Sequence, residues 1–493
     1  MEHFVTTIAL IGIVIIVASL LSGALERTGM PLVVVFLGLG AVLGPWGLGL
    51  VDIELASPAL RTLATLGLAL VLFSDAVTIE ITEIRSRQRL AWRILGPGTL
   101  APAVIIAFAA HFLLDVSAAA AAILGAALAS TDPVLLRSVL RSPALPATPR
   151  VALRLEAGMN DVVLLPIVVI ATLIMQSAQS GASALSAADV GHHLLGLFIL
   201  GPALGALIGW LGIIVLGRVR AGVGVRRDYE SLYALGLAFS GYAAAEAVGG
   251  SGFLAAFAAG LMVASQDIEL CDCFLEYGEA TAEMLLLLTF VALGTSLIWT
   301  GFTVIDGPTL IFAVVALTAR TVVLLPVLRG LDVSERDRRI IALFGPRGLS
   351  SLLFTLLPVF AGVHGAERLF TVTCLVALLS VVLHGGGIAL FLRANGAAAR
   401  APRAPLPLAI APASIDSSTE PGESVPDTIT VAEYQARVER GEPLIVVDSR
   451  AGRNYYADRG QPRGAIRIPP EDPVRSATEQ RLSKRAMLVV YCA

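Results

Sequence analysis

The chain has 493 residues, of which 56% are hydrophobic and only 15% are charged, and its mean hydropathy is +0.81. A soluble globular protein carries about 25% charged residues, so this composition predicts a polytopic membrane protein and excludes a chain that is soluble throughout. The net charge of −3 and the four scattered cysteines give no support for a nucleic-acid partner or for a disulfide framework.

Apolar runs close to the ~20 residues that cross a bilayer follow one another along most of the chain. The first, Phe4–Leu25, has no basic segment before it and no cleavage site, so we expect a span and not a cleaved signal peptide. Pro31–Gly44 and Gly252–Ser265 are short enough to be half-spans. On this criterion we expect about thirteen spans, over residues 4–25, 31–44, 59–78, 94–114, 118–140, 151–174, 193–216, 229–248, 252–265, 280–299, 308–328, 340–363 and 368–392.

Arginines gather in the loops that follow odd-numbered spans, whereas loops such as Trp46–Pro58 and Gln176–His192 are almost free of basic residues. The positive-inside rule therefore places the N-terminus outside and the C-terminus in the cytoplasm, which requires an odd number of spans. The acidic loop Gln266–Glu279 is an exception to this pattern. The arginines concerned are Arg85, Arg87, Arg89, Arg93, Arg137, Arg141, Arg150, Arg154, Arg218, Arg220, Arg226, Arg227, Arg336, Arg338 and Arg339.

The fifth apolar run contains an aspartate beside a proline, Asp132-Pro133, preceded by Thr131. Pro133 removes a backbone donor and should break the helix at that point. A carboxylate inside a membrane span is costly and marks a functional site by default. The bland alternative is an aspartate that only holds two helices together, and a second aspartate, Asp161, in the next span makes that alternative weaker.

A second interruption lies in the twelfth run, at Phe344-Gly345-Pro346-Arg347-Gly348. Two broken helices at matching positions of two halves are the sequence sign of an inverted-repeat transporter. If the two breaks cross, Arg347 is placed to offset the negative helix ends or to pair with a carboxylate. The alternative is that Arg347 extends its guanidinium toward the membrane surface.

Glu156 and Asn160 share one face of the sixth run, and Asp161 lies next to that face. Carboxylate, amide and hydroxyl oxygens are hard ligands that suit Na⁺, and Asp132, Asp161, Asn160 and Thr131 supply such a set. A buried carboxylate can hold a proton or a metal cation but not both, and this competition is the physical basis of cation/proton antiport.

A third buried carboxylate needs a cationic partner, and Arg320 in the eleventh run is the candidate partner for Glu156. Asp75, at the end of the third run, is expected at the membrane interface. Glu246 in the eighth run is a candidate for lining the funnel on the cytoplasmic side.

In combination, these motifs resemble the monovalent cation:proton antiporter-1 family, the sodium/proton exchanger type, over about residues 4–392. The resemblance implies a dimeric, all-α membrane fold of about thirteen helices with two broken crossing helices, and alternating access with the ion bound at Asp132 and Asp161. It also implies a structural ion pair between Glu156 and Arg320 that holds Asn160.

The same resemblance bears on the transported ion. An Asn-Asp pair, here Asn160-Asp161, resembles the electroneutral members of the family. The family usually has serine where this chain has Ala157, which leaves the choice between Na⁺, K⁺ and Li⁺ open.

The membrane part is expected to end at residue 393, and an Ala/Pro/Ser-rich linker should cover 394–424. Residues 425–493 resemble the start of a rhodanese-like domain, a small α/β unit with a helix at Thr430–Gly441 and buried strands at Leu444–Asp448 and Leu488–Tyr491. Because the chain stops one residue after Cys492, the position of the catalytic cysteine, we expect this domain to be incomplete and inactive.

We therefore expect a secondary antiporter of the bacterial inner membrane, not an enzyme. It should exchange Na⁺, or else K⁺ or Li⁺, for H⁺, as a homodimer in the bilayer, without a cofactor and without nucleic acid. A membrane-anchored sulfurtransferase or sulfur sensor that uses the tail is the alternative.

Overall fold

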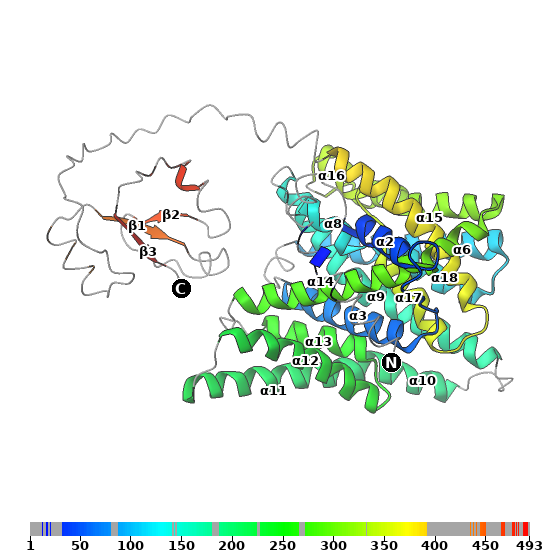
Figure 1. Cartoon of the computed structure of the whole chain (residues 1–493), viewed down its shortest axis with the longest axis horizontal. Coiled ribbons are helices and arrows are strands. Elements are labelled where there is room, and N and C mark those ends of the chain that lie inside the picture. Colours follow the sequence, from blue (N-terminus) through cyan, green and yellow to red (C-terminus); the bar gives the residue numbers. More distant parts are fainter. Residues whose placement is uncertain are drawn as a thin grey trace. The chain divides into compact units, whose positions relative to one another are not determined.

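The computed structural model describes residues 32–79, 87–140, 145–179, 187–223, 227–265, 272–331 and 333–391, and in the tail 444–449, 465–468, 476–478 and 487–491, with some isolated residues besides. The chain divides into two compact units, Met1–Pro402 and Arg403–Ala493. Figure 1 labels their elements. The first unit is built of helices, and a small sheet lies in the second.

The helices of the first unit follow the apolar runs of the sequence, and the short interruptions fall at proline, glycine and serine. The first half comprises α2 (Leu32–Leu43), α3 (Pro58–Val77), α5 (Gln88–Leu95), α6 (Pro97–Leu114), α7 (Ala118–Ala129), α8 (Pro133–Leu140), α9 (Ala147–Gln179) and α10 (Ala187–Leu195). The second half comprises α11 (Gly201–Gly222), α12 (Arg227–Ala247), α13 (Gly252–Ser265), α14 (Asp272–Thr295), α15 (Gly307–Val327), α16 (Glu335–Leu343), α17 (Leu349–Phe360) and α18 (Ala366–Ser380). Wider π-helical turns at Gly196–Leu200 and Val381–Gly385 continue α10 and α18, and a 3₁₀ turn at Leu297–Val304 follows α14.

Helix starts are fixed by side-chain caps at several membrane boundaries. Ser57 accepts the N–H of Leu60, and Pro58 occupies the first turn of α3, where a missing donor costs nothing. Asp306 caps α15 in the same way by accepting the N–H of Thr309 at 2.7 Å. These local signals determine where α3 and α15 enter the bundle.

Within the described residues, six helices are long and apolar enough to cross a membrane, and a seventh is added if the bent pair 281–295 and 297–304 counts as one. Shorter apolar helices are Val33–Leu43, Ala118–Ala129, Gly252–Ser265 and Leu349–Phe360. The chain is therefore a multi-pass membrane protein. The expected first span, Phe4–Leu25, lies almost wholly outside the described residues.

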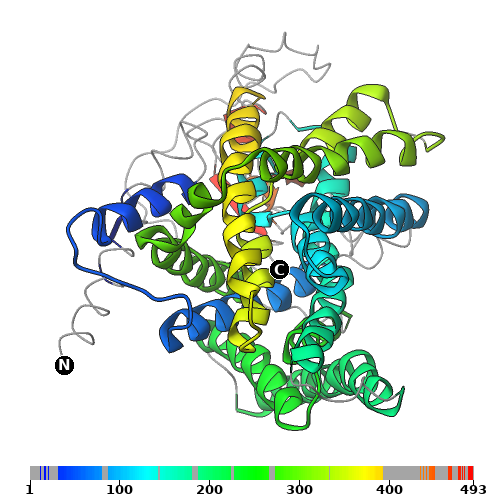
Figure 2. The same ribbon diagram turned by 90° about the vertical axis from the view of Figure 1, so that its right-hand side faces the viewer.

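The helices of the membrane unit pack in two groups. The broken-helix group consists of α5–α9 and α15–α18, and the flanking group consists of α2, α3 and α11–α14. Contacts between the groups run from α3 to α9 and α17, from α2 to α8, and from α18 to the 3₁₀ turn. Figure 2 shows α18, in yellow, along the length of the unit. Small residues allow close helix approach in the flanking group: a side chain at Gly205 would lie 2.0 Å from the carbonyl oxygen of Ala255.

Both breaks expected from the sequence are present. α7 ends at Ala129 and α8 begins at Pro133, while α16 ends at Leu343 and α17 begins at Leu349. Each break places free backbone groups deep in the unit, where they need partners. In the second unit, β1 (Leu444–Asp448), β2 (Ile466–Arg467) and β3 (Met487–Tyr491) form a parallel sheet in the order β2-β1-β3.

Candidate functional site: the crossing of two broken helices

The two breaks meet and bind each other through the backbone. The N–H of Asp132 donates to the carbonyl oxygen of Pro346 at 2.9 Å. In return, the carboxylate of Asp132 accepts the N–H of Leu349, the first residue of α17, at 2.7 Å. Asp132 is 1% exposed, so the crossing satisfies backbone groups that no water reaches.

Glycines permit this close approach. A Cβ atom at Gly348 would lie 2.0 Å from a carboxylate oxygen of Asp132. One at Gly345 would lie 2.6 Å from the side chain of Arg320. The charged side chains of Arg320 and Asp132 therefore pack directly against the backbone of the Gly-Pro-Arg-Gly segment, at the two glycines.

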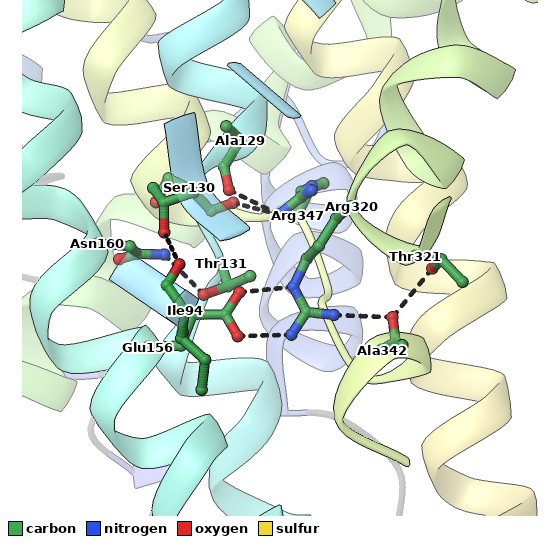
Figure 3. A network of polar contacts seen from close by, with 11 residues as sticks. Ile94, Ala129, Ser130, Thr131, Glu156, Asn160, Arg320, Thr321, Ala342 and Arg347 are labelled. Carbon is green, nitrogen blue, oxygen red and sulfur yellow. Dashed lines mark hydrogen bonds and ion pairs between the residues drawn. The ribbon is translucent and has the colours of Figure 1, made fainter. Parts of the chain in front are cut away.

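Arg347 is fully buried and neutralises the end of a helix. Its guanidinium donates to the carbonyl oxygens of Ala129 at 2.9 Å and Ser130 at 3.0 Å, at the C-terminus of α7 (Figure 3). The backbone N–H of Arg347 donates to the hydroxyl of Ser380 on α18 at 2.6 Å. The guanidinium of Arg347 is thus directed at the C-terminal end of α7 and not toward the surface, and its role in offsetting the negative helix end stays a prediction.

Glu156 of α9 and Arg320 of α15 form a bidentate ion pair. The two N–O distances are 2.5 and 2.6 Å, and the side chains are 4% and 2% exposed (Figure 3). The third donating nitrogen of Arg320 reaches the carbonyl oxygen of Ala342 at the end of α16, at 2.8 Å. The pair therefore ties α9 and α15 to the broken helix.

The remaining site residues of α9, Asn160 and Asp161, face the break between α7 and α8. The amide of Asn160 donates to the hydroxyl of Thr131 at 2.7 Å (Figure 3), and the hydroxyl of Ser130 donates to the carboxylate of Asp161. The resemblance implied that the ion pair holds Asn160, but the partner that the structure gives its amide is Thr131. The carbonyl oxygen of Asn160 is buried and has no hydrogen-bond partner among the described residues.

Sequence reasoning missed two hydroxyls beside the carboxylates. Ser130 contacts Asp161 directly, and Ser350 in the first turn of α17 lies next to the same carboxylate. A hydroxyl residue directly before Thr131 was the available signal for Ser130. Nothing in the sequence placed Ser350 there, because its position depends on how the two breaks cross.

Two further residues lie close to the site. Asp75 is half-buried against α9, where a Cβ at Gly158 would be 3.7 Å from its own Cβ, and its expected interfacial position stays a prediction. Ala157 is 3% exposed and packs in a hydrophobic cluster with Leu136 and Phe344, so its methyl group contacts apolar side chains of the broken helices.

The site has little free volume. A cavity of about 10 Å³ lies beside Asp132 and Ser350, with apolar side chains of α3, α14 and α17 around it. A larger cavity of about 330 Å³, lined by Arg61, Tyr242 and Glu246 among others, lies at the end of the unit away from the arginine-rich loops. α12 starts at Arg227 and crosses the unit before it reaches Glu246, so Glu246 lies at the opposite end from the arginine-rich loops.

Residues 13–394 match the family model described as sodium/hydrogen exchanger, transmembrane. The chain belongs to the sodium/hydrogen exchanger family. This exchanger is 28% identical over 420 residues to the K(+)/H(+) antiporter NhaP2 of Shewanella sp. (strain MR-4), a match that covers 82% of the exchanger and 69% of the relative. It is 26% identical over 392 residues to the K(+)/H(+) antiporter NhaP of Alkalimonas amylolytica. This match covers 79% of the exchanger and 66% of the relative.

The exchanger also shares its fold with a solved structure, that of the sodium proton antiporter MjNhaP1 from Methanocaldococcus jannaschii at pH 8. The TM-score is 0.63 at 20% sequence identity, and the match covers 79% of the exchanger and 99% of MjNhaP1. Family and fold are thus those of a cation/proton transporter. Cys492 of the tail lies outside the described residues, and the rhodanese resemblance stays a prediction.

Proposed function

We propose that the protein exchanges a monovalent cation for H⁺ across the bacterial inner membrane, with the cation and the proton competing for Asp132 and Asp161. Thr131, Asn160 and Ser130 complete the oxygen-rich site, and Glu156–Arg320 and Arg347 hold its geometry. Na⁺ is the cation expected from the ligand set, and K⁺ is the alternative that the names of the relatives suggest.

One observation carries this proposal, the balance of buried charge at the crossing. Among the residues that the structure describes, the carboxylates of Asp132, Glu156 and Asp161 are buried at the crossing together with two guanidinium groups, those of Arg320 and Arg347. Each guanidinium is already engaged, one with Glu156 and one with the end of α7. The excess of one negative charge in a water-poor interior favours the uptake of one positive charge, either a metal cation or a proton. An exchange of one for one is electroneutral.

The remaining architecture follows from the same assignment. We place about thirteen spans in the membrane, with the arginine-rich loops and the C-terminus in the cytoplasm and the N-terminus outside. The cavity at Glu246 then opens to the outside, and the flanking group supplies the contacts of a homodimer. Thr172 lines that cavity and lies eleven residues beyond Asp161 on α9, about 16 Å along the helix, so a conformational change must connect the two.

The decisive test is Asp161→Asn in proteoliposomes that carry a pH gradient. Addition of Na⁺ or K⁺ should dissipate the gradient with the wild-type chain, and the variant should give the same signal as empty vesicles. Asp52→Asn, at an exposed loop carboxylate, is the control and should exchange normally. Exchange by Asp161→Asn at the wild-type rate contradicts the site assignment.

A cation series with Li⁺, Na⁺ and K⁺ at several pH values identifies the transported ion. Competition for the same carboxylates requires the apparent affinity for the cation to fall as the pH falls. Ala157→Ser tests whether the missing hydroxyl sets the preference among the three cations. An unchanged order of cations in that variant removes residue 157 from the specificity argument.

A further inference from the structure

A large pocket lies outside the ion site, at a surface of the broken-helix group where apolar side chains are exposed. Its volume is about 910 Å³, and α15, α16 and residues 383–391 form its walls. This volume falls at the upper end of the range for small-molecule sites. α15 and α16 lie next to each other in the first unit (Figure 1).

One end of the pocket is basic. Arg336 and Arg339, both on the first turns of α16, line it together with Glu335. Glu335 pairs with Arg339 at 3.0 Å and with Arg338 at 3.4 Å. Arg336 is exposed and has no ion-pair partner among the described residues, so this end presents an unbalanced positive charge.

The rest of the pocket is apolar and open. Val322, Leu343 and Leu383 contribute to its walls and are 63%, 56% and 61% exposed. Such side chains on a membrane span face hydrocarbon. The basic end lies on the first turns of α16, just before the expected span over residues 340–363, so we infer that it lies at the depth of lipid head groups.

A cationic end at head-group depth, joined to an apolar groove at hydrocarbon depth, has the complementary chemistry of an anionic amphiphile. Basic pockets between membrane helices bind anionic lipid head groups in this way. We propose that the pocket is a binding site for one anionic phospholipid, with its phosphate at Arg336 and Arg339 and an acyl chain along Val322 and Leu383.

The pocket shares three of its walls with the supports of the crossing. Phe344 packs in one cluster with Leu136 of α8. Thr321 donates to the carbonyl oxygen of Ala342, the same oxygen that accepts from Arg320. A bound lipid therefore steadies α16 against α15, and its effect on the rate rests on the proposed function.

A third connection runs through a histidine. His384 lines the pocket, and its Nδ1 lies 3.0 Å from the hydroxyl of Ser380. That hydroxyl accepts the N–H of Arg347 at the crossing. An acyl chain against His384 is thus two hydrogen bonds away from the residue that neutralises the end of α7.

The test measures lipid retention by the full chain and needs no ion exchange. The protein is taken from nanodiscs of phosphatidylglycerol and phosphatidylcholine, and native mass spectrometry counts the phospholipids that stay bound. One variant, Arg336→Gln with Arg339→Gln, removes the basic end. Its control, Arg218→Gln with Arg329→Gln, removes the same charge from exposed positions outside the pocket.

A second variant blocks the groove and leaves its charges in place. Gly387 lines the pocket and has open space at its Cβ, so Gly387→Phe fills the groove without a backbone clash. Gly386→Phe, at the neighbouring exposed position outside the pocket lining, is its control.

The wild type should retain one phosphatidylglycerol in preference to phosphatidylcholine. Both pocket variants should bind it roughly tenfold more weakly or worse, and both controls should bind it normally. Equal retention by pocket variants and controls overturns the proposal. It is also overturned if Gly387→Phe separates a dimer and leaves lipid retention unchanged, because the face then binds a second copy of the chain.

Discussion

At the scale of single residues, the site depends on groups that have no spare room. Asp132 is held against Gly348, and Arg320 is held against Gly345, at distances that leave no space for a side chain. Glu156 and Arg320 depend on each other electrostatically, because either charge alone would be buried without a partner. Two predictions follow from these contacts.

Gly348→Ala should abolish exchange and leave the helical fold in place. The added methyl group would overlap the carboxylate oxygen of Asp132, so that carboxylate must leave its bond to Leu349. Proteoliposome exchange and circular dichroism measure the two properties. Gly386→Ala, where no atom lies within 4 Å of the new Cβ, should behave as wild type. Normal exchange by Gly348→Ala would show that the crossing tolerates a displaced Asp132.

Glu156→Gln and Arg320→Gln should each destabilise the protein by about 3–5 kcal/mol, because each leaves one charge buried alone. The double variant should lose much less than the sum of the two single losses, since neither charge then remains. Thermal unfolding in detergent gives the comparison. Additive losses would mean that the two groups do not depend on each other.

At the scale of elements, the broken helices are held by donors and acceptors from each other and from α18. Arg347 supplies two hydrogen bonds to the last carbonyl oxygens of α7, and Ser380 accepts the N–H of Arg347. A helix end without such donors would carry unsatisfied carbonyl groups in hydrocarbon.

Arg347→Gln should therefore reduce exchange more than Ser380→Ala does. The first removes a buried charge and its bonds to two carbonyl oxygens, whereas the second removes a neutral hydroxyl that contacts one N–H and the Nδ1 of His384. The initial rate of cation-induced gradient dissipation, normalised to the amount of reconstituted protein, measures both. A larger loss with Ser380→Ala would place the critical contact on α18.

The breaks themselves were predictable, because proline and glycine interrupt apolar runs at Pro133 and at 344–348 and these residues act locally. The partners across the crossing were not, because the Ser130–Asp161 and Asn160–Thr131 contacts depend on how the helices pack. The contact of Asp75 with α9 was not predictable for the same reason, since it is tertiary. Glu246 lies nineteen residues after Arg227, about 28 Å along α12, so the positive-inside rule and the expected place of Glu246 in a cytoplasmic funnel disagree.

At the scale of the whole molecule, two compact units have separate cores. The membrane unit, Met1–Pro402, contains every residue of the proposed ion site, and the sheet of the second unit is held by β1–β2 and β1–β3 pairing of its own. We therefore expect exchange to require only the membrane unit.

A chain that ends at Pro402 should exchange cations at close to the full-length rate, because the crossing and its supports all precede that residue. The same proteoliposome assay, with equal amounts of the two proteins, compares them. Cys492→Ala changes only one residue of the tail in the 493-residue chain. This variant should also leave the exchange rate unchanged. A rate that falls in either case would assign the tail a part in transport.

The small cavity beside Asp132, about 10 Å³, has a consequence for what can pass through the protein. This volume is little more than the centre of one water molecule needs, so it has no room for a cation inside its hydration shell. The oxygens of the site must replace the water that the ion sheds, as the carbonyl oxygens of a selectivity filter do. Cations are then sorted by the free energy of dehydration against the spacing of these oxygens, and a bulky, permanently charged cation such as tetramethylammonium should neither be transported nor compete in the proteoliposome assay.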